Sequence, residues 1–437
     1  MNRFAKAAIT AAALMTALPA FAQSFAITNA RLIDGTGAPE QANATIVVRN
    51  GRIASVGSGA APAGLETIDA GGNYVTPGLI DASSSLGIVE VGAVRQTNDR
   101  SAGDSPYSAA LDVAAAINPA STAMAVARIE GVTRAAVMPA PADDLFGGIG
   151  RAISLDATDK TPVLPGHRYL TIDLGEGGAR RAGGSRAAAF TRLADAFREA
   201  DAFARNRSGY AFGRTKDALL TRADAEALVD VIRGRIPAMI SVDRASDIRA
   251  VLALKSDYPR MDMILTGVAE GWLVADELAR ANVPVIVTPT QNLPARFETL
   301  AATQSNAGRL AAAGVKVAIT DGASPSISPQ LPQQAGQTVA QARIPGASGL
   351  SHEDAVAAIT GVPAMILGLD DAGRIARGNH ADIVIWDGDP LETTSAPTAI
   401  WIDGNAQPME SRQTKLAARY NPTAPDTNLP KQYSRGE

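Results

Sequence analysis

The middle of the chain alternates short, wholly apolar runs with longer stretches of helical periodicity. Continuous apolar strands that alternate with helices are typical of a buried parallel sheet. Thr221 is followed three residues later by Asp224, and this Thr-x-x-Asp spacing resembles a capping box. We therefore expect one such helix to begin at Thr221. The pattern predicts strands at 133–138, 238–242, 261–265, 283–287 and 315–320, and helices at 185–206, 221–233, 245–255, 270–281 and 296–313.

Both ends of the chain have the shorter periodicity of β-structure. Residues 25–33 alternate, and the runs 45–48 and 52–56 flank Asn50-Gly51, a dipeptide that favours a type I′ hairpin turn. Near the other end, 381–386 and 398–402 are also strand-like. Two β-rich ends around a long βα middle indicate one small β-domain that both termini build together.

These patterns define the expected architecture. We expect an α/β protein with a TIM-like (β/α)8 barrel and a small composite β-sandwich, because a barrel needs about 250 residues and the chain has 437. Periodicity alone leaves an open parallel sheet as the alternative. The predicted units are a signal peptide at 1–22, a composite domain of 23–77 and 370–410, a barrel at 78–369 and a polar tail at 411–437.

Two segments and the tail lack clear periodicity. Residues 84–96 and 143–184 are rich in Gly and polar residues, and we expect them to form loops over the barrel mouth. The chain after Pro408 contains several prolines and is expected to be extended or poorly ordered. The run Gly147-Gly148-Ile149-Gly150 lacks the Lys of a phosphate-binding loop, so it predicts no phosphate site.

The first residues are typical of a secretory signal. Arg3 and Lys6 precede an apolar run at 7–18, and Ala20-Phe21-Ala22 is a small-x-small cleavage pattern. We therefore expect a mature chain that begins at Gln23 and a periplasmic location. No later run reaches the roughly 18 apolar residues of a membrane helix. The chain has no Cys, and its net charge of −4 without basic runs argues against a nucleic-acid partner.

Two motifs resemble the amidohydrolase superfamily. Val75-Thr76-Pro77-Gly78-Leu79-Ile80-Asp81 is similar to the segment that leads into the first barrel strand of that superfamily. The segment 358–391, which ends in Ala381-Asp382-Ile383-Val384-Ile385-Trp386-Asp387-Gly388-Asp389-Pro390-Leu391, resembles the closing segment of imidazolonepropionase-like and prolidase-like members. The resemblance implies a barrel enzyme that hydrolyses carbon–nitrogen bonds with one or two divalent ions, such as zinc, at the barrel mouth.

The metal ligands implied by the resemblance are mostly replaced. The family has His-x-His on strand 1, a carboxylate or modified Lys in the middle of the barrel, single His residues on strands 5 and 6, and Asp on strand 8. Here Ser83 and Ser85 stand at the first two His positions, and Ser241 stands at the strand 5 position. The strand 6 segment 265–270 contains no His, and Asp321 alone remains, at the strand 8 position.

Neutral hydroxyls are poor substitutes for imidazole on zinc-like ions. We therefore expect no tight metal site and treat zinc as implied by the family alone. Asp321 is the candidate catalytic residue, either as a general base or as a vestigial ligand. The candidate binding residues at the barrel mouth are Ser83, Ser85, Ser241, Asp243 and Arg244.

Several other polar residues allow two interpretations. Asp243 and Arg244 form a local ion pair or contact a ligand, and the sequence does not decide between these. Glu270 is expected to open a helix, where the helix dipole favours a carboxylate. The three His residues have no ligand spacing: His167 is expected in a loop, His352 on the surface at a helix start, and His380 in a turn of the β-domain.

Three functional hypotheses remain. The first is a hydrolase scaffold for non-peptide or dipeptide amide bonds that is catalytically impaired by the loss of its His ligands. The second is an active hydrolase whose mononuclear site is rebuilt on Asp321 with Asp81, Asp243 or Glu270. The third is a periplasmic ligand-binding protein, or a partner subunit that forms an oligomer with an active homologous amidohydrolase. Each would take a small peptide-like or amino-acid-like ligand.

Overall fold

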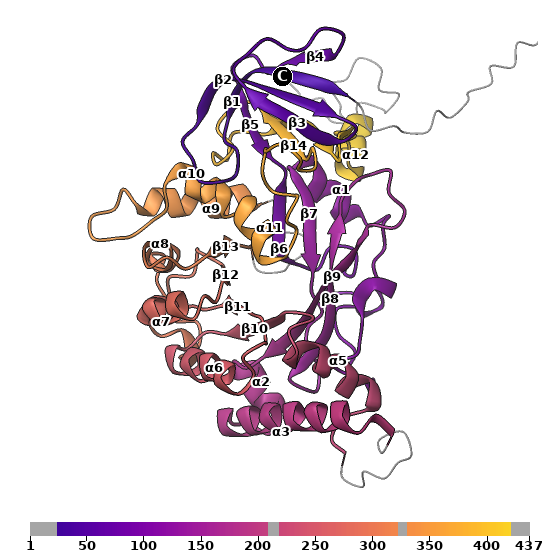
Figure 1. Cartoon of the computed structure of the whole chain (residues 1–437), viewed down its shortest axis with the longest axis vertical. Helices are drawn as coiled ribbons and strands as arrows, with labels where there is room; N and C mark the ends of the chain where they lie inside the picture. Colours follow the sequence, from indigo (N-terminus) through magenta and orange to yellow (C-terminus); the bar gives the residue numbers. More distant parts are fainter. Residues whose placement is uncertain (1–23, 209–217, 322–329, 421–437) are drawn as a thin grey trace, which may run out of the picture.

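The computed structural model describes residues 24–208, 218–321 and 330–420. These residues form two separate sheets with helices around one of them (Figure 1). The predicted signal peptide and the end of the predicted tail, 421–437, lie outside the described residues. None of the helices in the described ranges is long and apolar enough to cross a membrane.

One of the two eight-stranded sheets is a nearly closed barrel with the strand order β13-β12-β11-β10-β9-β8-β7-β6. Its two end strands, β6 and β13, lie close together. The hydroxyl of Thr320, just after β13, donates to the carboxylate of Asp81 on β6 at 3.2 Å. The expected barrel is thus confirmed. Its strands are β6 (Leu79–Ser84), β7 (Val132–Val137), β8 (Phe146–Ser154), β9 (Val163–Asp173), β10 (Ala238–Val242), β11 (Met263–Gly267), β12 (Val285–Val287) and β13 (Val317–Ile319).

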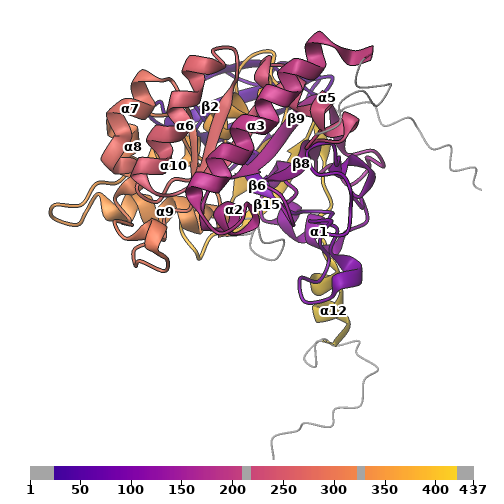
Figure 2. The same cartoon turned by 90° about the horizontal axis from the view of Figure 1, so that it is seen from below.

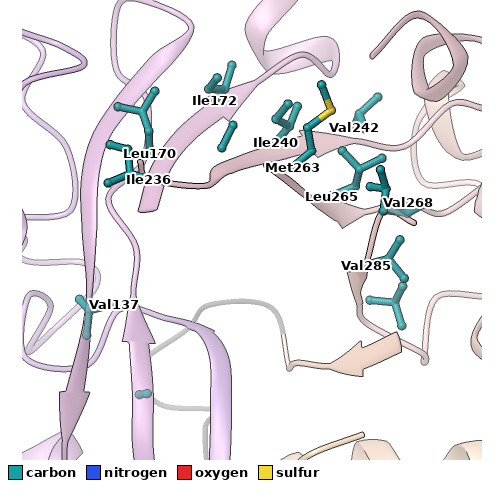
Figure 3. Packing of buried hydrophobic residues seen from close by; sticks show 14 of the residues in the cluster. Val137, Leu170, Ile172, Ile236, Ile240, Val242, Met263, Leu265, Val268 and Val285 are labelled. Carbon is teal, nitrogen blue, oxygen red and sulfur yellow. The ribbon is translucent and has the colours of Figure 1, made fainter. Parts of the chain in front are cut away.

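Side chains of the barrel strands alternate between two cores, as the two-residue repeat of a strand requires. Met239, Ile264 and Ile286 belong to the core inside the barrel. Their neighbours Ile240 and Leu265 belong to the outer core against the helices (Figure 3). Residues two positions beyond the inner set, at the carboxyl ends of the same strands, therefore also face the barrel interior.

Helices cover the outside of the barrel. Figure 2 shows α6, α7 and α8 side by side along the outer face of the strands, as in Figure 1. The Thr221 hydroxyl accepts the backbone N–H of Asp224 at 3.1 Å, so the predicted helix start is confirmed. The α-helices are α1 (Thr122–Ile129), α2 (Glu176–Arg181), α3 (Arg186–Arg205), α5 (Arg222–Ile232), α6 (Ala245–Asp257), α7 (Ala275–Arg280), α8 (Asn306–Ala312), α9 (Leu331–Gln341), α10 (His352–Ala357), α11 (Gly361–Ile366) and α12 (Arg412–Tyr420).

Three local predictions were wrong. Much of 143–184 is not loop, because it forms β8 and β9, and β8 runs antiparallel to both neighbours. A regular βα repeat is therefore absent between the second and fourth barrel strands. Residues 296–313 are not one helix but a 3-10 turn at Phe297–Thr299 and then α8. The tail is not extended throughout, since α12 occupies 412–420.

Strands from both chain ends form the second sheet, as expected. Ring centroids of Phe25 on β1 and Trp401 on β15 lie 5.2 Å apart, although two strands separate β1 and β15 in the sheet order, so the sheet curves around its own core. Asn50 and Gly51 have positive φ between β2 and β3, which fits the predicted type I′ turn. The strands are β1 (Phe25–Leu32), β2 (Gln41–Arg49), β3 (Arg52–Gly57), β4 (Glu66–Asp69), β5 (Tyr74–Pro77), β14 (Ile383–Trp386), β15 (Pro397–Ile402) and β16 (Asn405–Ala406).

A buried ion-pair cluster joins the barrel to this composite sheet. The Arg134 guanidinium on β7 donates to Asp382 at 2.6 Å and to Asp403 at 2.8 Å. The side chains of Arg134 and Asp382 are 3% and 2% exposed.

At Gly78, between β5 and β6, an added Cβ would overlap the Thr133 side chain. The close approach of β7 thus explains the Gly in this motif.

Candidate functional site

A cavity of about 370 Å³ opens at the carboxyl ends of the barrel strands. Ser83 and Ser241 both line it, so two of the three predicted Ser positions meet at the barrel mouth. Ser241 pairs in register with Asp173 on β9 and with Thr266 on β11. Because Ser241 follows the inward-facing Met239 by two residues, its side chain faces the barrel interior. Ser83 at the end of β6 and Ser241 on β10 therefore reach the same cavity.

Ser85 is placed differently. It lies one residue beyond β6, is fully buried, and does not line the cavity. Its carbonyl oxygen accepts the backbone N–H groups of Ile88 and Val89, both at 3.2 Å, in the turn that follows the strand. A register shift between Asp81 and Ser84 explains the difference, since an irregular strand end breaks the simple alternation. The predicted convergence of Ser83 and Ser85 on one cavity was therefore wrong for Ser85.

Asp321 lies beside the cavity rather than on its lining. Thr320, one residue earlier, lines the cavity and donates its hydroxyl to the Ser83 carbonyl at 3.3 Å. The Asp321 carboxylate is buried, and neither oxygen has a hydrogen-bond partner among the described residues. Burial, and secondarily the negative charge of Asp81, raise the pKa of Asp321 to about 8. Asp321 is thus positioned to carry a proton near neutral pH.

Asp243 and Arg244 do not form an ion pair with each other. The Asp243 carboxylate bonds to Arg296 at 2.8 Å and to the Ala269 N–H at 3.1 Å, while Arg244 bonds to Asp247 at 2.5 Å. Burial raises the pKa of Asp243 to about 6, against the opposing effects of Ala269 and Arg296. Neither residue lines the cavity. The local ion-pair interpretation was therefore wrong, and both side chains tie the loop after β10 to its neighbours.

Glu270 has a structural role. Its two carboxylate oxygens accept the backbone N–H groups of Ala245 at 3.0 Å and Ala301 at 3.1 Å. It therefore fastens the start of α6 and the loop before α8, and it immediately precedes the 3-10 turn Gly271–Val274. This placement agrees with the expectation that Glu270 opens a helical segment.

Three charged residues that sequence reasoning did not select also line the mouth cavity: Arg100, Asp173 and Arg181. Arg181 Nη1 donates to the Asp173 carboxylate at 2.7 Å, so these two charges compensate each other. Arg100 forms no ion pair with any carboxylate of the described residues. Burial lowers the pKa of the Arg100 guanidinium, and no carboxylate of the described residues raises it.

A signal for one of these residues was present in the sequence. The run Tyr169-Leu170-Thr171-Ile172 has the aromatic and β-branched residues that favour a strand and is followed directly by Asp173, and a polar residue at the carboxyl end of a barrel strand is a site candidate. Arg100 gave no such signal, because it lies in a polar loop without periodicity. Its place in the cavity depends on the fold of that loop, where its carbonyl accepts the Ala140 N–H at 2.8 Å.

The residues of the mouth do not fit a zinc-like ion. Within the described ranges, no group of three or more His, Cys, Asp or Glu is arranged to hold a metal. The eight residues 322–329, which follow Asp321, contain none of these types. The cavity instead presents hydroxyls of Ser and Thr, an Asp–Arg pair and Arg100. Zinc favours nitrogen, sulfur and carboxylate ligands, so this donor set is unsuited to it.

The three His residues are distributed over the fold. His167 was expected in a loop, but it belongs to β9, near the amino end of that strand and opposite the mouth. His352 was expected on the surface, but it is partly buried and its Nε2 lies 2.8 Å from Asp389. His380 bonds to Asp371 at 3.1 Å and to Asp403 at 2.5 Å, beside the composite sheet. None of them lines the mouth cavity.

Comparisons with known sequences point to one family. The family model described as "Amidohydrolase family" matches residues 220–413. The imidazolonepropionase of Cereibacter sphaeroides is 27% identical over 386 residues, covering 82% of this chain and 91% of the relative. Amidohydrolase tasK of Hapsidospora irregularis is 25% identical over 376 residues. That match covers 78% of this chain but only 37% of tasK, so the chain spans about a third of this relative.

Solved structures share the fold. An amidohydrolase from Thermotoga maritima MSB8 superposes with a TM-score of 0.76 at 23% identity, covering 87% of this chain and 99% of its own. Molinate hydrolase superposes with a TM-score of 0.55 at 16% identity, covering 89% and 95%. At these identities the likeness concerns the fold alone. The family match over residues 220–413 and the imidazolonepropionase relatives support membership of the amidohydrolase superfamily.

Proposed function

We propose that this protein is a catalytically impaired amidohydrolase that binds a small anionic ligand at the barrel mouth. One observation carries the proposal: Ser83 and Ser241 line the mouth cavity at positions where the resemblance implies metal-binding His residues. Hydroxyls at both positions leave a zinc-like ion without the imidazole ligands it needs.

The chemical consequence is the loss of an activated nucleophile. Members of the family are generally metal-dependent, and a bound metal lowers the pKa of water from about 15.7 to about 7. Asp321 could still act as a general base. Such catalysis contributes only about 10²- to 10⁴-fold, however, which is too little for amide hydrolysis alone. No His of the described residues lines the cavity to activate Ser83 or Ser241 as a nucleophile.

The charge of the cavity supports an anionic ligand. Asp173 is already compensated by Arg181, whereas Arg100 has no carboxylate partner among the described residues. A planar guanidinium favours a carboxylate, which it can bind through two parallel hydrogen bonds. Hydroxyls such as those of Ser241 and Thr266 supply further donors. These features suit the carboxylate of an amino-acid-like or peptide-like compound.

A second candidate function rests on Asp321. Its buried carboxylate has no hydrogen-bond partner in the described part of the chain, and Asp81 lies close enough to raise its pKa. Such a pair is what a mononuclear site rebuilt without His would use. We rank this active-hydrolase function second, because two carboxylates with hydroxyls would hold a transition metal only weakly.

Two further proposals concern the context in which the protein works. We propose that residues 1–22 direct export and that the mature chain acts beside an active, metal-bearing relative. Amino-terminal sequencing of the exported protein should give Gln23 as the first residue. Size-exclusion chromatography of the two purified chains together should show a joint peak, and two separate peaks would exclude the pairing.

Binding and turnover test the main proposal together. Calorimetric titration should detect N-acetyl amino acids and not the matched amides, which lack the carboxylate. Arg100→Met should abolish this binding, whereas Arg95→Met should retain it, because Arg95 is exposed and does not line the cavity. Equal binding of acids and amides, or hydrolysis of an amide panel that a chelator abolishes, would contradict the proposal.

A further inference from the structure

A second cavity, of about 530 Å³, lies at the opposite end of the barrel from the mouth. We call it the basal cavity. Pro237, Met263, Pro284 and Lys316 line it, and each lies at or just before the amino end of a barrel strand, from β10 to β13. The mouth residues lie at the carboxyl ends of the same parallel strands. The two cavities are therefore separated by the length of the barrel and its inner core.

Apolar side chains form the inner wall of the basal cavity. Tyr169, Ile264 and Leu367 line it and also belong to the core that fills the barrel interior. The Tyr169 hydroxyl donates to the Leu367 carbonyl at 2.7 Å, so its polar end is already satisfied. Met365, after the middle of α11, lines the cavity and is 40% exposed. Tyr169, Ile264 and Leu367 are at most 2% exposed, so the accessible apolar surface comes from Met365 and from the partly exposed Pro237 and Pro284.

Cations dominate the rim. Arg168 and Arg235 share a single carboxylate, Asp230, at 3.7 Å and 2.5 Å. Lys255 and Lys316 have no ion pair within the described ranges, and Lys255 donates only to the neutral Ala281 carbonyl at 3.2 Å. The cavity is lined by one carboxylate, Asp262, and by four cations, Arg168, Arg235, Lys255 and Lys316.

The positive charge of the lining remains in excess when Asp230, which lies outside the lining, is also counted. Asp230 and Asp262 supply two negative charges against the four cations, so these residues together keep an excess of positive charge. The Nε atom of Arg168 is buried without a hydrogen-bond partner in the described part of the chain. A concave apolar surface with a few converging charges is the usual composition of a small-molecule site.

We propose that the basal cavity binds a small organic anion whose apolar body packs on Met365, Pro237 and Pro284 and whose carboxylate or phosphate lies among Lys255, Lys316 and Arg168. This site is distinct from the mouth and does not depend on the proposed function. Occupancy here would stabilise the folded barrel, since a ligand that binds only the folded state shifts the unfolding equilibrium.

Fluorine NMR can test the site with a defined probe. The probe is 4-(trifluoromethyl)benzoate, and its uncharged control is 4-(trifluoromethyl)benzamide. We expect the benzoate resonance to broaden on addition of the protein and the benzamide resonance to stay sharp. The combined variant Lys255→Gln and Lys316→Gln should weaken benzoate binding by at least about tenfold, because charge-assisted hydrogen bonds to the anion are lost.

Two control variants locate the binding. Lys160→Gln removes an exposed cation that does not line the basal cavity, and Arg100→Met alters only the mouth. Both should bind the benzoate as the wild type does. A loss with Lys160→Gln would indicate general electrostatic attraction, and a loss with Arg100→Met would place the probe at the mouth. Either result, or no broadening with the wild type at millimolar protein, would overturn the proposal.

Discussion

The fully buried Arg134 and the partly buried Arg100 should respond differently to the same substitution. Arg134 is surrounded by carboxylates: burial disfavours its charge, but Asp382 and Asp403 outweigh burial and raise the pKa of Arg134. Arg100, at the mouth, has no such partner in the described residues. Replacing each arginine by Met keeps much of the length of the side chain and removes its positive charge. The comparison tests whether Arg100 is a ligand-binding group or a structural one.

The magnitudes follow from burial. The Arg134 and Asp382 side chains are 3% and 2% exposed, so Arg134→Met strands a buried carboxylate. Removing one partner of a buried ion pair typically costs about 3–5 kcal/mol of unfolding free energy. Adding Asp382→Asn should recover part of this loss, because the stranded charge is removed while an amide oxygen can still accept the Asp403 N–H, now bonded at 2.9 Å.

Arg100→Met should not destabilise the protein. Substitutions outside a paired network usually change stability by less than about 0.5 kcal/mol, and removal of an uncompensated charge acts in the stabilising direction. Urea unfolding followed by circular dichroism and Trp fluorescence measures both variants. Arg95→Met, in an exposed pair with Asp104, serves as the control and should give no measurable change. A loss of about 2 kcal/mol or more for Arg100→Met would show that Arg100 has a structural partner and would refute the reasoning.

Three further outcomes can be checked by the same unfolding assay. Gly78→Ala should destabilise the fold by about 1–3 kcal/mol through overpacking against Thr133, and Thr133→Ala should recover part of that loss. Asp321 has a folded pKa of about 8 against 3.8 for the free group, so the folded state binds its proton more tightly between these values. Wild-type stability should therefore fall relative to Asp321→Asn as the pH rises from about 4 to about 8, and parallel curves would contradict the raised pKa. The hydrogen bond to Asp389 raises the pKa of His352, so His352→Gln should cost most stability below about pH 6.5 and progressively less as the pH rises through the folded pKa.

Sequence periodicity predicted much of the barrel because its strands are buried on both faces. The strand at 238–242 was predicted at its observed bounds, since a short, wholly apolar run between two helices is typical of a strand in a buried parallel sheet. The antiparallel β8 was missed for a physical reason. Its residues Phe146–Ser154 include three glycines, and Gly in a strand removes the side-chain pattern on which the prediction depends.

The candidate site was only partly predictable. Ser83 and Ser241 were found because they stand at positions where the resemblance implies metal-binding His residues, and both line the mouth cavity. Ser85 was misplaced because the end of β6 is irregular. Arg100 could not have been found, since its position depends on a long loop whose path the local sequence does not specify. Asp243 pairs with Arg296, which is far away in the sequence. Arg244 pairs with Asp247, three residues later, instead of with its neighbour Asp243.

Metal content measured beside activity tests the central claim most directly. The purified mature protein, expressed with added zinc and then dialysed, would be analysed for metals by mass spectrometry and assayed on an amide panel with and without a chelator. We expect far less than one zinc per chain and no chelator-sensitive hydrolysis. The double variant Ser83→His and Ser241→His should raise zinc affinity, because it restores imidazole ligands at the mouth. Stoichiometric metal in the unmodified protein, removed by the chelator together with hydrolytic activity, would contradict the claim that this barrel has lost its catalytic metal site.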